Sequence, residues 1–253
     1  MASHSDIMIP SAIIFTAVWK FAFPLALRFN PKAMARNIAK DAQFPSKWAD
    51  RCTSQLHAIL ATLFALWNLY HWQDNIPVDR LFGYTRALGR EAAITAGYFC
   101  WDLFICVWDF HNYGPSYVIH AVVCLSCFIM GLCGVMLGYA PVFLLYEAST
   151  IFLNGHWLLE KSEVPKSLLL LNDLVLIACF FGIRLVWGGW QTMKLLADLY
   201  WNYNNLPWQA VLVLSIGLFS ISILNNFWFI KIVLSARKSL RKNPHNIAKE
   251  KSI

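Results

Sequence analysis

The segment YVIHAVVCLSCFIMGLCGVML runs from Tyr117 to Leu137 and contains no Asp, Glu, Lys or Arg among its 21 residues. An apolar stretch of this length can cross the hydrocarbon core of a bilayer as a helix. The whole chain has the same character: 58% of its 253 residues are hydrophobic and only 14% are charged, whereas about a quarter are charged in soluble domains. The sequence therefore excludes an ordinary soluble globular domain and predicts an all-α, polytopic membrane protein.

Comparable apolar stretches recur along the chain, separated by turns that contain Gly or Pro, and predict about seven transmembrane helices in a single membrane domain. The expected ranges are Ile7–Leu27, Cys52–Trp72, Ala92–Asp109, Tyr117–Leu137, Pro141–Leu159, Leu168–Gly188 and Trp208–Leu234. Residues 1–6 contain no Lys or Arg, so we expect the first helix to be retained rather than cleaved as a signal peptide.

Basic residues are distributed unevenly between the two sides of the predicted membrane. If the C-terminus is cytosolic, fifteen of the 21 Lys and Arg residues fall in cytosolic loops and the tail, four fall on the opposite side and two lie within spans. Cytosolic loops of membrane proteins carry such an excess. We therefore expect a cytosolic C-terminus and interpret the net charge of +7 as a topology signal, not as a nucleic-acid-binding surface.

The chain ends in Lys249-Glu250-Lys251-Ser252-Ile253. Lysines three and five residues from the end resemble the dilysine signal that returns membrane proteins to the endoplasmic reticulum. We expect an endoplasmic reticulum membrane protein, with a merely basic tail as the alternative interpretation.

Charged and amide side chains interrupt the apolar spans. A charge at the centre of a transmembrane helix costs about 2.5–3.5 kcal/mol on insertion scales, so each one needs a reason. Asp102 lies midway along the third span, and Asp109 follows on nearly the same helical face. Glu147, Thr150 and Asn154 form a polar stripe along the fifth span. These groups cannot all face lipid, so we expect an interior cavity that opens toward the cytosol.

Further polar and aromatic candidates lie near this stripe. They are Arg184 in the sixth span, His120 and His156 near cytosolic helix ends, and Trp101 and Trp157. Structural roles are the alternatives: an Asp102–Arg184 ion pair that fixes helix register, asparagines as hydrogen-bonding contacts between helices, and tryptophans at the membrane interfaces. We expect no metal and no cofactor, because no two histidines stand three or four residues apart.

Four short motifs resemble, in order and spacing, the TLC-domain family, which includes ceramide synthases and smaller TLC-domain-containing proteins. They are GYFCWDL from Gly97, YVIH ending at His120, EASTIFLN from Glu147 and FGIR ending at Arg184. The resemblance covers about residues 50–235 and is greatest to the smaller proteins. It implies a first helix with a basic cytosolic loop (1–50), a six-helix TLC-like core around a central cavity (51–235) and a basic cytosolic tail (236–253).

The sequence departs from the family pattern where ceramide synthases carry catalytic histidines. The family commonly has two adjacent histidines, whereas this chain has His120-Ala121, and the further His-Asp pair of ceramide synthases has no counterpart in the fifth span. An acyl transfer would use such a histidine as a base or in an acyl relay. The departures weigh against N-acylation.

Carboxylic acid chemistry is the interpretation that we favour. A carboxyl group in an apolar site is held protonated and can donate a proton, and aromatic faces stabilise a developing cation. We expect a membrane-embedded enzyme that acts on a lipophilic isoprenoid or lipid substrate, most concretely by proton-initiated, terpene-cyclase-like cyclisation or isomerisation. Glu147 and Asp102 are the candidate acids and His120 the base or orienting residue. The candidate substrate-binding residues are Asn154, Arg184, Trp101, Trp157, Asp109 and His156.

Two other functions stay open. One is acyl-CoA-dependent N-acylation of a sphingoid-like amine, as the family resemblance implies. The other is non-catalytic lipid sensing or trafficking, in which the buried polar groups serve only folding. In all three cases the expected partners are a lipophilic small molecule and the membrane lipids.

Overall fold

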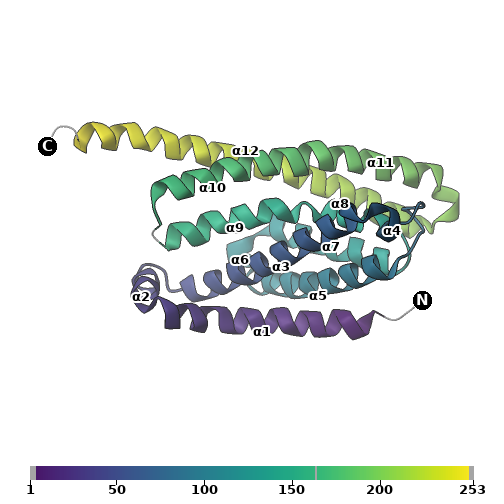
Figure 1. Ribbon diagram of the computed structural model, residues 1–253, viewed down its shortest axis with the longest axis horizontal. Helices are drawn as coiled ribbons and strands as arrows, with labels where there is room; N and C mark the ends of the chain where they lie inside the picture. The colour runs from purple at the N-terminus through teal and green to yellow at the C-terminus, as the bar shows by residue number, and fades with distance from the viewer. Residues whose placement is uncertain (1–3, 163, 251–253) are drawn as a thin grey trace.

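The computed structural model describes residues 4–162 and 164–250, with side chains described as far as residue 237. Within these residues the chain is helical and contains no strand (Figure 1). The elements, in order, are α1 (Ser5–Phe29), α2 (Pro31–Lys40), α3 (Phe44–Tyr70), α4 (Trp72–Asn75), α5 (Arg86–Trp108), α6 (Phe110–Tyr113), α7 (Pro115–Leu132), η1 (Leu137–Tyr139), α8 (Ala140–Leu144), α9 (Glu147–Lys161), α10 (Lys166–Cys179), η2 (Phe180–Trp187), α11 (Gly188–Trp201), η3 (Tyr203–Asn205) and α12 (Trp208–Glu250).

Five of the helices are long and apolar enough to cross a membrane: α1, α5, α7, the continuous helix over residues 166–201, and α12 over Trp208–Arg237. The expectation of an all-α, polytopic membrane protein is confirmed. The second predicted span is also helical, as α3, whereas the fifth, Pro141–Leu159, is divided into α8 and α9 by a turn at residues 145–146. Buried polar residues such as His57 and Asn68 reduce the apolar character of α3, and α9 has only 15 residues. The count of seven crossings stays a prediction.

The sixth predicted span was expected to end at Gly188, and this boundary is wrong. The helix runs on without a break from α10 through η2 to the end of α11. Gly188 lies inside it, at a position where a Cβ atom would collide with the ring of Tyr146. The glycine therefore permits close packing between helices rather than ending one.

The helices form an elongated bundle (Figure 1). Helix α1 packs on α5 and α3, α5 packs on α7, α3 packs on α9, and α12 packs on α7. Helices α1 and α5 are in close contact because residue 97 is a glycine: a Cβ atom there would collide with the Met8 carbonyl oxygen. Ser11 Oγ also donates to the Ile94 carbonyl oxygen at 2.9 Å.

The two ends of the bundle carry different elements. Helix α1 begins at one end and α12 finishes at the other (Figure 1), as an odd number of membrane crossings requires. Helix α2 lies at the end where α9 finishes and α10 begins. This is the end that the distribution of basic residues assigns to the cytosol. The expected dilysine signal lies outside the residues whose side chains the structure describes.

Candidate functional site

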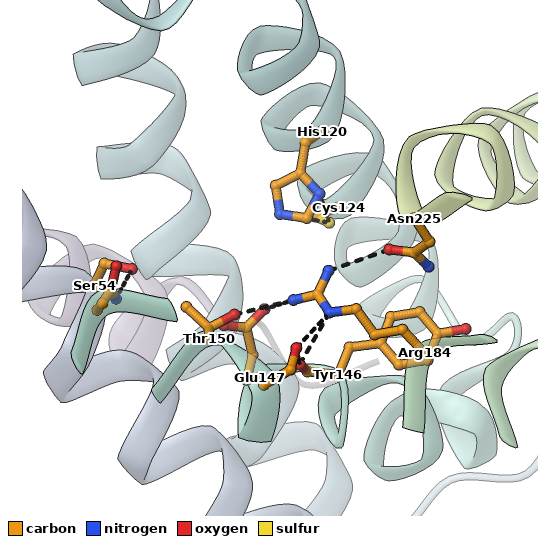
Figure 2. Close-up of polar contacts among 10 residues, drawn as sticks. Ser54, His120, Cys124, Tyr146, Glu147, Thr150, Arg184 and Asn225 are labelled. Carbon is orange, nitrogen blue, oxygen red and sulfur yellow. Dashed lines mark hydrogen bonds and ion pairs between the residues drawn. The ribbon is translucent and has the colours of Figure 1, made fainter. Parts of the chain in front are cut away.

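Arg184 is the centre of a buried polar network. It belongs to η2, a stretch of π-helix, and such widened turns occur often at functional sites. The side chain is only 6% exposed. Its Nε donates to Ser149 Oγ at 2.8 Å and to the Tyr146 carbonyl oxygen at 3.2 Å. Figure 2 shows the guanidinium between residues of α9 and α12.

The remaining guanidinium nitrogens connect three elements. Arg184 Nη2 donates to Thr150 Oγ1 at 2.9 Å, and Nη1 donates to Asn225 Oδ1 at 3.2 Å. Nη2 also lies 3.8 Å from Oε1 of Glu147, the first residue of α9. The network therefore joins α9, η2 and α12 through one cation. The alternative interpretation of an Asp102–Arg184 ion pair is wrong, because the guanidinium is directed at Glu147 instead.

His120 lies next to this network on α7. Its ring faces the guanidinium in Figure 2, with Cys124 one helical turn away. Cys124 Sγ is 3.7 Å from His120 Nδ1. The rings of Trp228 and Phe99 flank the imidazole, with centroids 5.4 and 5.9 Å away. His120 is therefore held among aromatic rings and beside a fixed positive charge.

Two hollows meet at these residues. The first, here called the polar chamber, has a volume of about 220 Å³. It is lined by Asp50, Arg51, Ser54, Tyr98, Phe99, Trp101, Asp102, Tyr113, Tyr117, His120, Glu147, Thr150, Leu153, Asn154, Phe180, Arg184, Trp228, Lys231 and Ile232. The second, the apolar chamber, has a volume of about 80 Å³, and residues such as Phe128, Leu144 and Leu218 line it.

The two chambers share four lining residues, Phe99, His120, Glu147 and Arg184. The polar chamber includes Arg51 and Lys231, which lie toward the predicted cytosolic end. The apolar chamber includes Cys127, Gly131 and the short helix α8. An amphiphile with its polar group in the polar chamber and the adjoining part of its hydrocarbon in the apolar chamber would present the bond between them to His120 and Glu147.

Asp102 lines the polar chamber but differs from Glu147 in its surroundings. Within the described part of the chain it forms no ion pair, and its polar contact is with Cys106 Sγ at 4.0 Å. A second acid in the chamber, Asp50, accepts hydrogen bonds of 2.6 Å from Trp19 Nε1 and from the Tyr113 hydroxyl. Asp102 is therefore the carboxyl group in this chamber with the fewest compensating partners.

Six of the nine residues predicted as site residues line the polar chamber: Asp102, His120, Glu147, Asn154, Arg184 and Trp101. Asn154 accepts from Arg51 Nη1 at 3.0 Å and donates to Ser54 Oγ at 2.9 Å. This contact joins α9 to α3, as expected for an asparagine between helices.

The other three predicted residues lie elsewhere. Trp157 packs in an aromatic cluster with Phe44, at a ring separation of 5.5 Å, because the aromatic residues at the start of α3 cover it. Asp109 accepts hydrogen bonds from the Asn112 side chain at the surface, at 2.7 and 2.9 Å. His156 Nδ1 pairs with Asp173 Oδ1 at 2.6 Å, beside a neighbouring hollow that shares Lys231 with the polar chamber.

Sequence reasoning missed several residues of the chamber. Arg51 and Lys231 were counted only as basic residues that set orientation, and Tyr98, Tyr113 and Trp228 were not singled out. The available signal was the spacing of Arg51 and Ser54, one helical turn apart at a membrane boundary. Among the described residues, no group of three His, Cys, Asp or Glu side chains is arranged to hold a metal.

Comparison with known proteins identifies the family. The model of the TLC domain matches residues 47–234, which is most of the chain and includes both chambers. The chain belongs to the TLC-domain family. The TLC domain thus begins with α3 and ends in α12, and α1 and α2 precede it.

Named relatives are TLC-domain proteins as well. An uncharacterized TLC domain-containing protein of Schizosaccharomyces pombe is 34% identical to the present chain, over 63% of this chain and 56% of its own length. One from Saccharomyces cerevisiae is 38% identical over 65% and 53%, respectively. Human TLC domain-containing protein 4 is 24% identical over 86% and 81%. The chain thus spans little more than half the length of the two fungal relatives. No solved structure matches significantly.

Proposed function

We propose that this TLC-domain protein is a membrane-embedded enzyme that acts on a lipophilic substrate by acid–base chemistry. The observation that carries the proposal is the meeting of the two chambers at His120 and Glu147, with Asp102 in the polar one. A site for lipid chemistry needs titratable groups at the boundary between a polar head and an apolar tail, and this cavity has them.

Asp102 is the proposed proton donor. Burial away from cations favours the neutral form of a carboxyl group, which can then donate a proton. Glu147 has a guanidinium 3.8 Å away, so it is better suited to accept a proton or to stabilise a positive charge. His120 can take up a proton released from the product.

Proton-initiated cyclisation or isomerisation is the most concrete form of this chemistry. Protonation of an alkene or epoxide creates a carbocation, and aromatic faces stabilise cations. The polar chamber presents seven aromatic side chains: Tyr98, Phe99, Trp101, Tyr113, Tyr117, Phe180 and Trp228.

Acyl transfer is the second candidate. It is favoured by the place of His120 between the chambers, where the carbonyl of an acyl chain bound in the apolar chamber would lie. Non-catalytic lipid binding uses the same cavity and is the alternative from another class. We further propose an endoplasmic reticulum membrane location with a cytosolic C-terminus.

The test is untargeted lipid mass spectrometry of cells that express the wild type or one of four variants at matched membrane levels. Asp102→Asn, Glu147→Gln and His120→Ala alter the chamber, whereas Asp109→Asn makes the same chemical change as the first variant outside it. We expect the three chamber variants to lose a product that the wild type and Asp109→Asn retain.

The identity of the accumulating lipid separates the candidates. An accumulating precursor with the same mass as the lost product supports cyclisation or isomerisation. A lost product that is heavier than the accumulating precursor by a fatty acyl group supports acyl transfer. Unchanged lipid profiles in all three chamber variants would overturn the enzymatic proposal and favour non-catalytic binding.

A further inference from the structure

We propose that the polar chamber binds the phosphate group of a single-chain amphiphile, that Arg51 and Lys231 hold this phosphate, and that the part of the hydrocarbon next to the head group enters the apolar chamber. The inference deepens the proposed function by naming the substrate class, and it rests on that proposal in assigning the cavity to a lipid and in taking Asp102 as neutral.

Arg51 is held in place by a neutral partner. Its Nη1 donates to Asn154 Oδ1 at 3.0 Å, and it forms no ion pair with a carboxylate in the described part of the chain. The neighbouring acid Asp50 is directed instead at Trp19 and Tyr113. The guanidinium thus lines the chamber with hydrogen-bond donors to spare.

Lys231 approaches the same chamber from α12. Its Nζ lies 4.3 Å from the centroid of the Phe227 ring, and among the described residues it has neither an ion pair nor a side-chain hydrogen bond. An ammonium group that only anchors a helix end at the membrane surface would not need to line a chamber. Two cations without an ion pair therefore line one chamber, Arg51 half-buried and Lys231 exposed.

The acids of the chamber do not cancel this positive charge. Glu147 is paired with Arg184, and Asp102 acts in its neutral form in the proposed mechanism. Asp50 directs both oxygens at the neutral donors Trp19 and Tyr113, so it sets one negative charge against two cations and leaves a net positive charge. An Arg and a Lys together form a common site for phosphate, because Arg donates in a planar fork and Lys adds a point charge.

The dimensions favour one hydrocarbon chain, with the phosphate close to its head. The apolar chamber of about 80 Å³ has room only for the part of one chain next to the head group, since a cavity of about 150 Å³ holds a benzene ring, and it cannot admit two tails side by side. In an acyl-CoA, a long pantetheine arm separates the phosphates from the reactive carbonyl. Here Arg51 and Lys231 line the same chamber as His120 and Glu147, so a phosphate directly attached to the lipid fits better.

Binding is tested with the purified full chain in lipid nanodiscs and two pairs of probes. Oleoyl lysophosphatidate is compared with oleoylglycerol, and farnesyl phosphate with farnesol; each pair differs only in the phosphate. Oleoyl-CoA is the fifth probe. The chamber variants are Arg51→Gln and Lys231→Gln, with Lys231→Arg as the charge-preserving change. The controls are Arg86→Gln and Lys194→Gln, at the other end of the bundle, where Lys194 also lies over an aromatic ring.

We expect the wild type to prefer a phosphate probe over its alcohol by about 10-fold or more, because charge-assisted hydrogen bonds carry that difference. The preference should fall in Arg51→Gln and Lys231→Gln, survive in Lys231→Arg and both controls, and weaken with salt. The pair that shows it distinguishes a glycerol lipid from an isoprenoid phosphate.

Three outcomes would overturn the inference: equal affinity for phosphate and alcohol, a phosphate preference unchanged in Lys231→Gln, or selective binding of oleoyl-CoA alone. Lys231→Gln is decisive because this lysine makes no hydrogen bond that the fold needs. Phosphate-dependent binding together with unchanged cellular lipids in the Asp102→Asn variant would sink the enzymatic proposal and leave the phosphate site standing.

Discussion

Arg184→Met removes a buried cation while keeping most of the volume of its side chain. The guanidinium carries hydrogen bonds to Ser149, Thr150 and Asn225 and the ion pair with Glu147. We expect the largest loss to come from Glu147, which is only 8% exposed and would be left buried without its cationic partner.

The magnitude follows from the asymmetry of buried ion pairs. Removing one partner costs about 3–5 kcal/mol in free energy of unfolding, whereas removing both is far less harmful. Because Glu147 also lines the polar chamber, where water can reach it, we expect a loss near the lower end, about 3 kcal/mol. Glu147→Gln should cost more in the wild type than in the Arg184→Met background, with a coupling energy of at least about 1 kcal/mol.

The assay is reversible unfolding in mixed micelles with increasing SDS, followed by tryptophan fluorescence, for the wild type, both single variants and the double variant. Lys194→Met is the control: its ammonium lies 5.2 Å from the Trp190 ring centroid, so its removal should cost no more than about 1 kcal/mol. Strictly additive losses in the cycle, or a loss for Arg184→Met no larger than that of the control, would refute the reasoning.

Three further predictions concern packing, pH and topology. Gly188→Ala places a Cβ against the Tyr146 ring and should lower the free energy of unfolding by about 1–3 kcal/mol; Gly189→Ala, which meets open space, should not lower it, and thermal melts compare the two. The hydrogen bond from Lys47, followed by that from the Gln43 amide, lowers the pKa of Asp41 below 3.8. Its stabilising contribution is therefore complete above that value and is lost as the pH falls through the folded pKa; Asp41→Asn should flatten the acid limb of a stability profile, and an unchanged limb would argue against the pair. A cysteine-reactive, membrane-impermeant reagent should label a tag at the C-terminus from the cytosolic side, and labelling from the opposite side would reverse the orientation.

The sequence predicted those helices whose apolar character is continuous. Spans such as α5 and α7 stand out because nearly every turn is apolar. Helix α2 was read as part of a basic loop, since its amphipathic face buries only Ala33 and Met34. The passage of one helix through Gly188 depends on the approach of Tyr146, and glycine alone favours a break. Tertiary contact decided that boundary.

The site was predictable in its residue types but not in its pairings. The free-energy cost of placing a charge within a transmembrane helix singled out Asp102, Glu147 and Arg184. Which acid meets the guanidinium depends on how the π-helical turn rotates Arg184, and no spacing rule supplies that rotation. Arg51 escaped notice because a basic residue at a helix end is explained equally well by membrane orientation.

The most direct test of the central claim, that the apolar chamber holds the part of an amphiphile's tail next to its head group, is photo-crosslinking with a single-chain probe that carries a diazirine in its tail close to the head group. Helix α7 offers an internal comparison: Val123, Cys127 and Gly131 line the chamber, whereas Ile119 and Val122 face outward. We predict adducts at the first three positions that an excess of the unlabelled amphiphile removes. Adducts confined to the outward positions, or insensitive to the competitor, would contradict the account.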